Sequence, residues 1–282
     1  MELGQFANAF PKKVFKVKGE MRELLSKFPD RIKKLICDGD FSEVHIGESS
    51  SQVFKVSTRR KGNLFLKVNP IAEHCFLLHE ARILEWLHGK LRVPEVVAYV
   101  KDETKEYVVL TEMLGINCVE AMDVLGHTEI VALLAAGLRE IHQIDISGCP
   151  FDESLETKLL NARYNLDHGL VDESDFDEER QGKTGQEIMA SLCRLRPTDE
   201  DHVFSHGDYC LPNVILRNNC ISGYIDLGRA GISDRYNDLA IASRSIYDNL
   251  GEGCEAQFFK EYGVNSVDED KIEYYRMMDE MF

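Results

Sequence analysis

The chain has 282 residues, of which 44% are hydrophobic and 29% are charged, a composition typical of a globular protein with two lobes or domains. No stretch approaches the roughly 18 apolar residues of a membrane span, and the N-terminus lacks the apolar core of a signal peptide. The eight cysteines are scattered without a Cys-x-x-Cys pair, which argues against a structural zinc site and a small disulfide scaffold. We therefore expect a cytoplasmic protein with reduced cysteines and no membrane partner.

The net charge of -16 is divided unevenly along the chain. Residues 1–114 carry a net charge of +3, whereas residues 115–282 carry -19. This division suits one half that faces a nucleotide and another that attracts cations, and it argues against a nucleic-acid partner. For any single carboxylate, an acidic surface that only confers solubility is the simpler explanation.

In the first third of the chain, alternating polar and apolar residues predict half-buried strands. The predicted strands cover residues 43–47, 52–56, 64–68 and 107–111, and a polar link occupies 57–63. Apolar residues at helical spacing predict a helix over 71–89, which ends at Gly89. A connector at 112–115 follows the last of these strands.

After residue 115 the pattern becomes mainly helical. Apolar spacing predicts a helix from Thr128 to Ile144, with Thr128 as its N-cap, and further helices near 154–169, near 236–250 and from about 268. The change of pattern predicts two lobes, residues 1–111 and 116–282, joined by the connector at 112–115.

The most informative motif is His206-Gly207-Asp208 with Asn213 five residues after the Asp, followed by Asp226 in Asp-Leu-Gly. Kinase-type phosphotransferases present a base and two metal ligands in this order. An acceptor hydroxyl needs a carboxylate near its proton, and ATP needs Mg²⁺ held by oxygen ligands. Asp208 suits the first role, whereas Asn213 and Asp226 suit the second. His206 is interpreted as a residue that orients this loop through hydrogen bonds.

Three features of the first lobe suit nucleotide binding. Lys67 lies in an apolar strand and is followed thirteen residues later by Glu80, which matches the Lys–Glu pair that holds an ammonium group against phosphates. Phe65 lies on the same face of that strand and either stacks on adenine or packs in the core. The turn Ser49-Ser50-Ser51 either covers the phosphates or is an ordinary polar hairpin.

Acidic residues of the second half have several readings. Asp234 and Asp238 are more consistent with a helix start that satisfies loop N–H groups than with further metal ligands. The run 172–179 holds six acids in eight residues, and the chain ends in Asp279-Glu280-Met281-Phe282. A solvated loop is the ordinary explanation of such a run. If these acids converge on one cleft, they would hold an acceptor with several ammonium groups.

Over about residues 35–282 the chain resembles the aminoglycoside phosphotransferases, in particular the kanamycin-type 3′-phosphotransferase branch. The resemblance rests on Phe65-Leu66-Lys67, Glu80, Thr111-Glu112-Met113, residues 204–213, residues 223–229, residues 244–246 and the terminal Asp-Glu-Met-Phe. It implies an α+β, protein-kinase-like bilobal fold with an N-terminal antiparallel sheet lobe containing one helix and a mainly helical C-terminal lobe.

The resemblance also implies roles for individual residues. Asp208 would be the catalytic Asp, Asn213 and Asp226 would hold Mg²⁺, and Thr111 and Met113 would offer backbone groups to the adenine of ATP bound between the lobes. The positions implied for a polycationic aminoglycoside are Asp175, Glu178, Arg229, Asp248, Glu280 and the carboxylate of Phe282. Asn249 departs from the family pattern, which often has a second acid after Asp248.

The leading hypothesis is therefore ATP-dependent phosphorylation of an aminoglycoside hydroxyl, with the 3′-hydroxyl as the expected acceptor group. Such a reaction would confer antibiotic resistance. A kinase for another small amine-bearing acceptor, such as choline or an amino sugar, would use the same catalytic residues. A catalytically inactive nucleotide-binding protein is a third hypothesis, although the five residues that catalysis needs are all present. Protein-kinase activity is disfavoured because no Ala-Pro-Glu segment follows Asp226. We expect no obligate protein partner.

Overall fold

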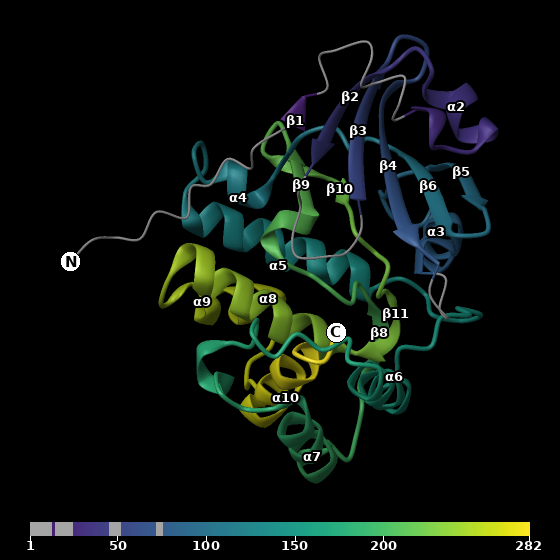
Figure 1. The fold of residues 1–282 in the computed structure, drawn as a ribbon. Helices are drawn as coiled ribbons and strands as arrows, with labels where there is room; N and C mark the ends of the chain where they lie inside the picture. Colours follow the sequence, from purple (N-terminus) through teal and green to yellow (C-terminus); the bar gives the residue numbers. More distant parts are fainter. Residues whose placement is uncertain (1–12, 15–24, 45–51, 72–75) are drawn as a thin grey trace. The chain divides into compact units, whose positions relative to one another are not determined.

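The structure is a computed structural model that describes residues 13–14, 25–44, 52–71 and 76–282 (Figure 1). The chain divides into two compact units, one within residues 1–88 and 93–113 and the other formed by residues 89–92 and 114–282. Within the described part of the chain, no helix combines the length and apolar character needed to cross a bilayer.

The first unit is built on a six-stranded antiparallel sheet with the order β1-β2-β3-β4-β6-β5. The strands are β1 (Lys13–Val14), β2 (Asp40–Val44), β3 (Gln52–Thr58), β4 (Gly62–Pro70), β5 (Val96–Lys101) and β6 (Lys105–Thr111). Among the described residues, helices α2 (Asp30–Ile36) and α3 (Phe76–Leu87) belong to the same unit. Alternation of side chains explains the strands, because Leu64, Leu66 and Val68 of β4 are buried in one core.

The sheet has two faces with different roles. Ile32 and Ile36 of α2 pack with Leu64 and Leu66 in the hydrophobic core on one face. The intervening residues of β4 point to the opposite face, where Glu80 of α3 bonds to Lys67. The alternation along β4 therefore separates a core-forming face from a polar face.

Several predictions for this unit change in detail. The strands 52–56, 64–68 and 107–111 are confirmed and are each longer than predicted, whereas β2 begins at Asp40 and residues 45–47 lie outside the described residues. The helix predicted over 71–89 is described as Phe76–Leu87. Strand β5 and helix α2 were not predicted.

The second unit is mainly helical, with two small sheets. Its helices are α4 (Cys118–Ala121), α5 (His127–His142), α6 (Leu155–Asp167), α7 (Gly185–Leu195), α8 (Arg235–Leu250), α9 (Cys254–Tyr262) and α10 (Glu269–Asp279), with short 3₁₀ turns η1 (Glu178–Arg180) and η2 (Leu211–Asn213). One sheet has the order β10-β9-β7 and the other pairs β11 with β8. These strands are β7 (Ile116–Asn117), β8 (His202–Ser205), β9 (Val214–Arg217), β10 (Cys220–Tyr224) and β11 (Gly231–Asp234).

The helices of this unit form two groups around α8. Helices α5 and α9 pack together on one side, and α10 packs on α8 and on α7 (Figure 1). The predicted helices near 154–169, 236–250 and 268 are confirmed. The predicted N-cap Thr128 is wrong, because the helix begins one residue before it: Gly126 is the N-cap, and its N–H donates to the Glu129 carboxylate.

Candidate active site

The segment that carries Asp208 runs from the end of β8 through η2, and a buried carboxylate of α8 binds its backbone. Asp238 of α8 accepts hydrogen bonds from the backbone N–H groups of His206 (2.8 Å) and Gly207 (2.9 Å). His142 of α5 brings its Nε2 within 2.9 Å of the same carboxylate. The interpretation of Asp238 as a residue that satisfies loop N–H groups is therefore confirmed, and its completely buried side chain fixes the loop to α8.

Asp234 also has a structural role. It caps α8 by accepting from the N–H of Tyr236 (3.0 Å), and its other oxygen bonds to the Lys271 ammonium at 2.9 Å. Both oxygens of this completely buried carboxylate therefore already have hydrogen-bond partners within the protein. The reading of this residue as a further metal ligand is disfavoured.

A glycine is required in this segment. Gly207 has a φ of +86°, and a Cβ at this position would lie 1.9 Å from the carbonyl oxygen of Arg229. The backbone of the segment that carries Asp208 is therefore pressed against the segment that follows Asp226. His206 is completely buried, which agrees with its interpretation as an orienting residue.

Asp208 and Asn213 lie together, as their spacing predicts. The Asn213 side-chain N–H₂ donates to Oδ2 of Asp208 (2.8 Å) and to its backbone carbonyl (2.9 Å). Burial raises the pKa of Asp208, although the positive charge of Arg229 opposes this shift. A carboxylate with a raised pKa is a better proton acceptor, and the bond from Asn213 fixes its orientation.

Asp226 is brought beside this pair by the backbone. The N–H of Ile225 donates to the carbonyl of Asn213 at 3.0 Å, and Asp226 itself has a φ of 63°, which is uncommon for a non-glycine residue. Because the amide nitrogen of Asn213 is directed at Asp208, its amide oxygen is left for a cation, and Asp226 supplies a carboxylate. This donor set fits Mg²⁺, which takes one or two protein oxygens together with substrate phosphates. Within the described ranges there is no group of three or more His, Cys, Asp or Glu side chains that could hold a metal by themselves.

The predicted Lys–Glu pair is present in the first unit. Lys67 Nζ lies 2.7 Å from Glu80 Oε1, and both side chains are largely buried. The Glu80 carboxylate therefore holds the Lys67 ammonium group on the polar face of β4. The β4 side chains on this face are partly buried.

Phe65 shares the polar face with Lys67 and is not a core residue. It is partly exposed, whereas its neighbours Leu64 and Leu66 are at most 1% exposed. The Lys55 ammonium lies 5.8 Å from the centre of the Phe65 ring. The core-packing alternative is thus disfavoured, and the ring remains available to stack on a base.

The connector residues are anchored to the sheet. Glu112 bonds to Lys55 (2.5 Å) and to the Asn63 side chain (2.7 Å), two polar residues that the sequence did not single out. Thr111 donates its N–H to the carbonyl of Glu95 (3.0 Å), so only its carbonyl could serve adenine. Met113 is partly buried beside it. Ser49, Ser50 and Ser51 lie outside the described residues.

Two of the acceptor residues implied by the resemblance, Arg229 and Glu280, belong to one ionic cluster at the C-terminal end of the chain. Arg229 bonds to Asp279 (2.5 Å), and Asp279 also bonds to Arg244, which in turn lies 3.3 Å from Asp177. The two arginines lower the pKa of the buried Asp279 to about 2, despite the opposing effect of burial.

Glu280 occupies a different environment from Asp279. Its side chain is 4% exposed and lies 3.2 Å from Arg180, and burial together with the nearby Asp177 raises its pKa to about 7. The ring of Phe282 stacks on Arg229, whose guanidinium carbon lies 4.9 Å from the ring centre. The C-terminus is therefore packed onto the segment that follows Asp226.

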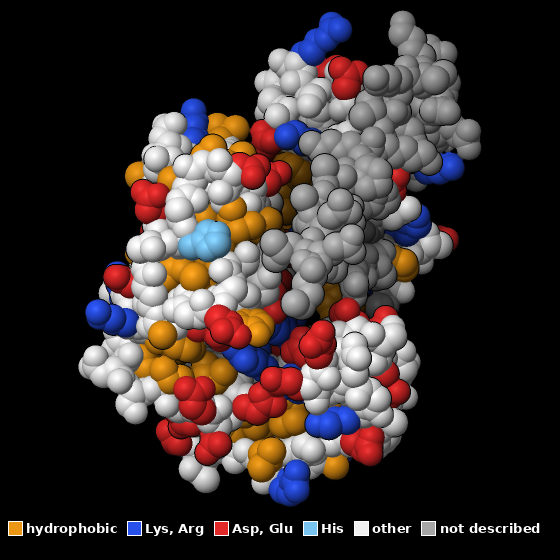
Figure 2. All heavy atoms as spheres, turned by 90° about the vertical axis from the view of Figure 1, so that its left-hand side faces the viewer, with side chains coloured by type: hydrophobic (Ala, Val, Ile, Leu, Met, Phe, Trp, Pro, Cys, Tyr) orange, Lys and Arg blue, Asp and Glu red, His pale blue; other side chains and the backbone are white. Residues whose placement is uncertain are grey.

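The remaining predicted acceptor residues are exposed. Asp175 and Glu178 lie in the acidic run 172–179, which we call the acidic loop, and Asp248 lies at the end of α8. The charges of Arg244 and Asp177 both act on Asp248, so it belongs to the same neighbourhood, and burial raises its pKa. Figure 2 shows acidic side chains recurring over the helical unit on the face in view.

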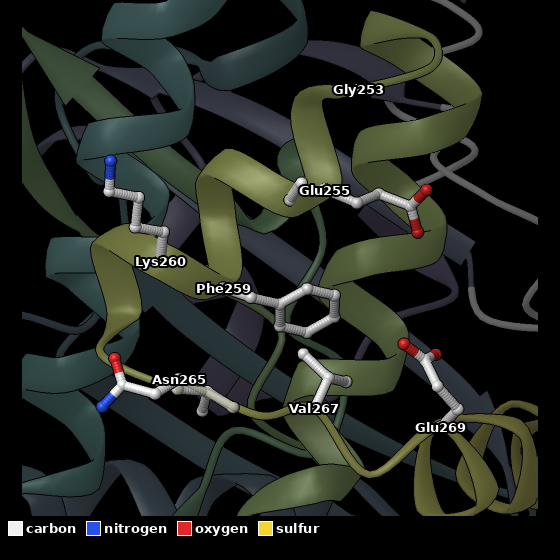
Figure 3. Close-up of a pocket in the computed structure, with 9 residues that line it drawn as sticks. Gly253, Glu255, Phe259, Lys260, Asn265, Val267 and Glu269 are labelled. Carbon is white, nitrogen blue, oxygen red and sulfur yellow. The ribbon is translucent and has the colours of Figure 1, made fainter.

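A surface hollow elsewhere on this unit contains none of these residues. It has a volume of about 510 Å³ and is lined by Glu255, Phe259 and Lys260 of α9 and by residues that connect α9 to α10 (Figure 3). Glu255 already bonds to Arg276 at 2.9 Å. This hollow is therefore not part of the candidate site, which consists of the side chains around Asp208.

Known proteins are similar to this chain over most of its length. The model of the APH phosphotransferase enzyme family matches residues 40–276. An aminoglycoside 3′-phosphotransferase of Niallia circulans is 36% identical over 263 residues, which cover 93% of this chain and all of the relative. A second, from Streptomyces fradiae, is 34% identical and covers 86% of this chain and 95% of its own length.

Solved structures agree on the fold. The crystal structure of an aminoglycoside 3′-phosphotransferase of type VIII matches with a TM-score of 0.79 and 33% identity, covering 93% of this chain and 97% of that one. The complex of APH(3′′)-Id from Streptomyces rimosus with ADP and streptomycin has a TM-score of 0.75 at 23% identity, covering 89% and 95%. The predicted α+β, protein-kinase-like fold is confirmed, and the chain belongs to the APH phosphotransferase enzyme family.

Proposed function

We propose that this chain transfers the γ-phosphoryl group of ATP to the 3′-hydroxyl of an aminoglycoside and thereby confers resistance to the antibiotic. The observation that carries the proposal is the arrangement of Asp208, Asn213 and Asp226 beside an acidic, arginine-braced cluster at the C-terminus. The relatives named above as aminoglycoside 3′-phosphotransferases support the acceptor. ATP as co-substrate implies a cytoplasmic location.

The first unit would bind the nucleotide. In this proposal, residues 1–111 form the nucleotide-binding lobe, 112–115 the hinge and 116–282 the catalytic lobe. Lys67, held by Glu80, would place its ammonium group on the α- and β-phosphates. Phe65 would stack on adenine, Thr111 and Met113 would offer backbone groups to it, and Ser49–Ser51 would cover the phosphates.

Asp208 would orient the acceptor hydroxyl and take its proton late. Phosphoryl transfer passes through a loose transition state in most analyses, so positioning and charge neutralisation contribute more than early proton removal. Asn213 and Asp226 would hold Mg²⁺, which when bound neutralises the charge on the phosphate oxygens. The bond from Asn213 keeps the Asp208 carboxylate oriented for the acceptor hydroxyl.

The acidic cluster would bind the ammonium groups of the acceptor. Asp175, Glu178 and Asp248 are exposed and can approach a polycation directly. Glu280 and the carboxylate of Phe282 would add negative charge, while Arg229 braces the end of the chain through Asp279. Charge-assisted hydrogen bonds from several ammonium groups favour a polyamine over an acceptor with a single quaternary amine.

The test is a panel of acceptors. ADP release is measured with ATP, Mg²⁺ and either kanamycin or an otherwise matched aminoglycoside that lacks the 3′-hydroxyl. We expect turnover with kanamycin and none above background with the 3′-deoxy compound. No turnover with any aminoglycoside would refute the proposal, and turnover with choline or an amino sugar instead would support the alternative of a different small-molecule kinase.

A further inference from the structure

Arg180 is a completely enclosed cation that the phosphotransfer chemistry does not use. It lies at the end of η1, directly after the acidic run 172–179, and its side chain is 2% exposed. Nη1 lies 3.1 Å from Asp177 and 3.2 Å from Glu280, and Nη2 lies 2.5 Å from Glu273. One guanidinium group thus binds three carboxylates, two of which are 93 and 100 residues away in the sequence.

The acidic loop is fixed at two points and exposed between and around them. Phe176 and Arg180 are buried, whereas Asp175, Glu178 and Glu179 are exposed. The backbone N–H of Asp177 also donates to the Glu280 carboxylate at 3.3 Å. The two buried anchors therefore decide where the exposed acids of the loop lie.

The same contacts continue toward the catalytic segment. Asp177, which Arg180 binds, also binds Arg244, and Arg244 shares Asp279 with Arg229. The backbone of Arg229 is the group against which Gly207 packs, one residue before Asp208. A series of ion pairs, completed by the backbone contact between Arg229 and Gly207, thus links the acidic loop to the segment that carries Asp208.

We propose that Arg180 is a positioning residue for the acceptor, because it clamps the acidic loop to Glu273 and Glu280 at the C-terminal end of the chain. Glu178, which lies on η1 with Arg180, would then keep a fixed position relative to Glu280 in the acceptor subsite. This inference rests on the proposed function, because the loop is taken to bind an ammonium-bearing acceptor. It goes further by assigning the geometry of that subsite to a residue that need not touch the acceptor.

Electrostatics explain why the clamp needs a cation. Without Arg180, Glu273 and Glu280 would lose this cation and Asp177 would keep only Arg244 as a partner. The three carboxylates would then repel one another more strongly. The charge of Arg180 also opposes the rise in the pKa of Glu280, so it favours the ionised form that an ammonium group needs. Loss of Arg180 would therefore displace the loop. It would also raise the pKa of Glu280 further, so that this carboxyl group would keep its proton up to a higher pH.

The kinetic test compares Arg180→Met and Arg180→Lys with the wild-type protein and with Arg194→Met, which removes an exposed arginine of the neighbouring helix α7. For Arg180→Met we expect the KM for kanamycin to rise by roughly tenfold or more, since a displaced subsite loses charge-assisted bonds. The KM for ATP should stay within about twofold, because the nucleotide residues lie on the other unit. Arg180→Lys should recover part of the loss, and Arg194→Met should match the wild type.

Two further measurements separate positioning from general stability. In a Glu280→Gln background, Arg180→Met should raise the KM for kanamycin less than it does alone, because the two residues act together. Amide hydrogen exchange over residues 172–182 should accelerate in Arg180→Met while exchange in α5 and α8 stays unchanged. If Arg180→Met does not fold, Arg180→Lys carries the same measurements.

The results have distinct meanings. An unchanged KM for kanamycin in both Arg180 variants, or equal increases in the KM for kanamycin and for ATP, would overturn the positioning role. Fully additive effects of Arg180→Met and Glu280→Gln would also overturn it. Absence of wild-type turnover with every aminoglycoside would instead refute the proposed function, and hydrogen exchange would still report whether Arg180 holds the loop.

Discussion

Glu280→Gln should change how the stability of the protein depends on pH. The pKa of Glu280 is raised from 4.5 to about 7, so its folded form retains a proton that the unfolded chain has already lost. A group of this kind destabilises the folded state progressively as pH rises from about 4.5 to 7, and the penalty is complete above the folded pKa. Gln mimics the protonated side chain and carries no such penalty.

The magnitude follows from the two pKa values. Each pH unit between them corresponds to 1.36 kcal/mol, and proton linkage then gives a difference of about 2 kcal/mol between pH 5.5 and pH 8. Relative to the wild type, Glu280→Gln should therefore gain about 2 kcal/mol in free energy of unfolding over this range. The groups that face Glu280 and set this value are Asp177 and Arg180, with Glu273 bound to the other side of the same arginine.

The assay is urea-induced unfolding followed by circular dichroism at pH 5.5, 7 and 8. Glu179→Gln, which neutralises an exposed acid of the same loop, is the matched control and should keep the pH dependence of the wild type. Parallel curves of unfolding free energy against pH for the wild type and Glu280→Gln would show that Glu280 is ionised throughout. That result would refute the assignment of a buried, proton-retaining carboxyl group.

Four other substitutions test the site. Asp208→Asn should lower kcat by roughly 10²- to 10⁴-fold with an unchanged Tm, as expected for loss of a proton acceptor, and a kcat near that of the wild type would contradict its role. Lys67→Met should lower kcat/KM for ATP by about 10²-fold in the same ADP-release assay, whereas loss of kanamycin affinity alone would argue against a phosphate contact. Phe65→Ala should raise the KM for ATP by up to about tenfold through loss of ring stacking, and a KM equal to that of the wild type would exclude stacking. Asp238→Asn should cost about 3 kcal/mol in urea unfolding, because two loop N–H groups and His142 lose a buried charged partner, and a loss below about 1 kcal/mol would show that they find other partners.

The contacts between Asp208 and Asn213 and between Lys67 and Glu80 could be predicted from sequence, because each pair is close in the chain. Asp208 and Asn213 are five residues apart, and one short loop brings them together. Lys67 and Glu80 lie on a strand and the helix that follows it, and their predicted pairing also rested on the Lys–Glu pair of kinase-type phosphotransferases. Local patterns fix such contacts before any tertiary structure is known.

Other elements were missed although the sequence contained a signal. Helix α7 begins with a capping box in which Thr184 and Glu187 satisfy each other's backbone N–H groups, a Thr-x-x-Glu pattern that can be read directly. The same reasoning corrects the start of α5, where Glu129 caps back to Gly126. Strands β8 and β11 have only four residues each, too few for alternation to be recognised.

The acceptor side could not be predicted in the same way, because its contacts join distant parts of the chain. Arg180 contacts Glu273 and Glu280 across 93 and 100 residues of sequence, and nothing in the acidic run reveals which acids will face inward. The sequence suggested a set of equivalent carboxylates. The structure divides them into those neutralised by an arginine and those exposed to solvent.

This division matters for how a lobe with a net charge of -19 can bind a polycation and still fold. Like charges gathered at one place destabilise the compact state, so an acidic subsite needs internal cations that the acceptor does not displace. Arg180, Arg229 and Arg244 supply that charge from buried or half-buried positions, and each is held by carboxylates of the C-terminal segment or the loop. The exposed acids then retain their charge for the acceptor. In the proposed acceptor site the arginines would therefore matter as much as the carboxylates do, because they determine which acids remain available and where those acids lie.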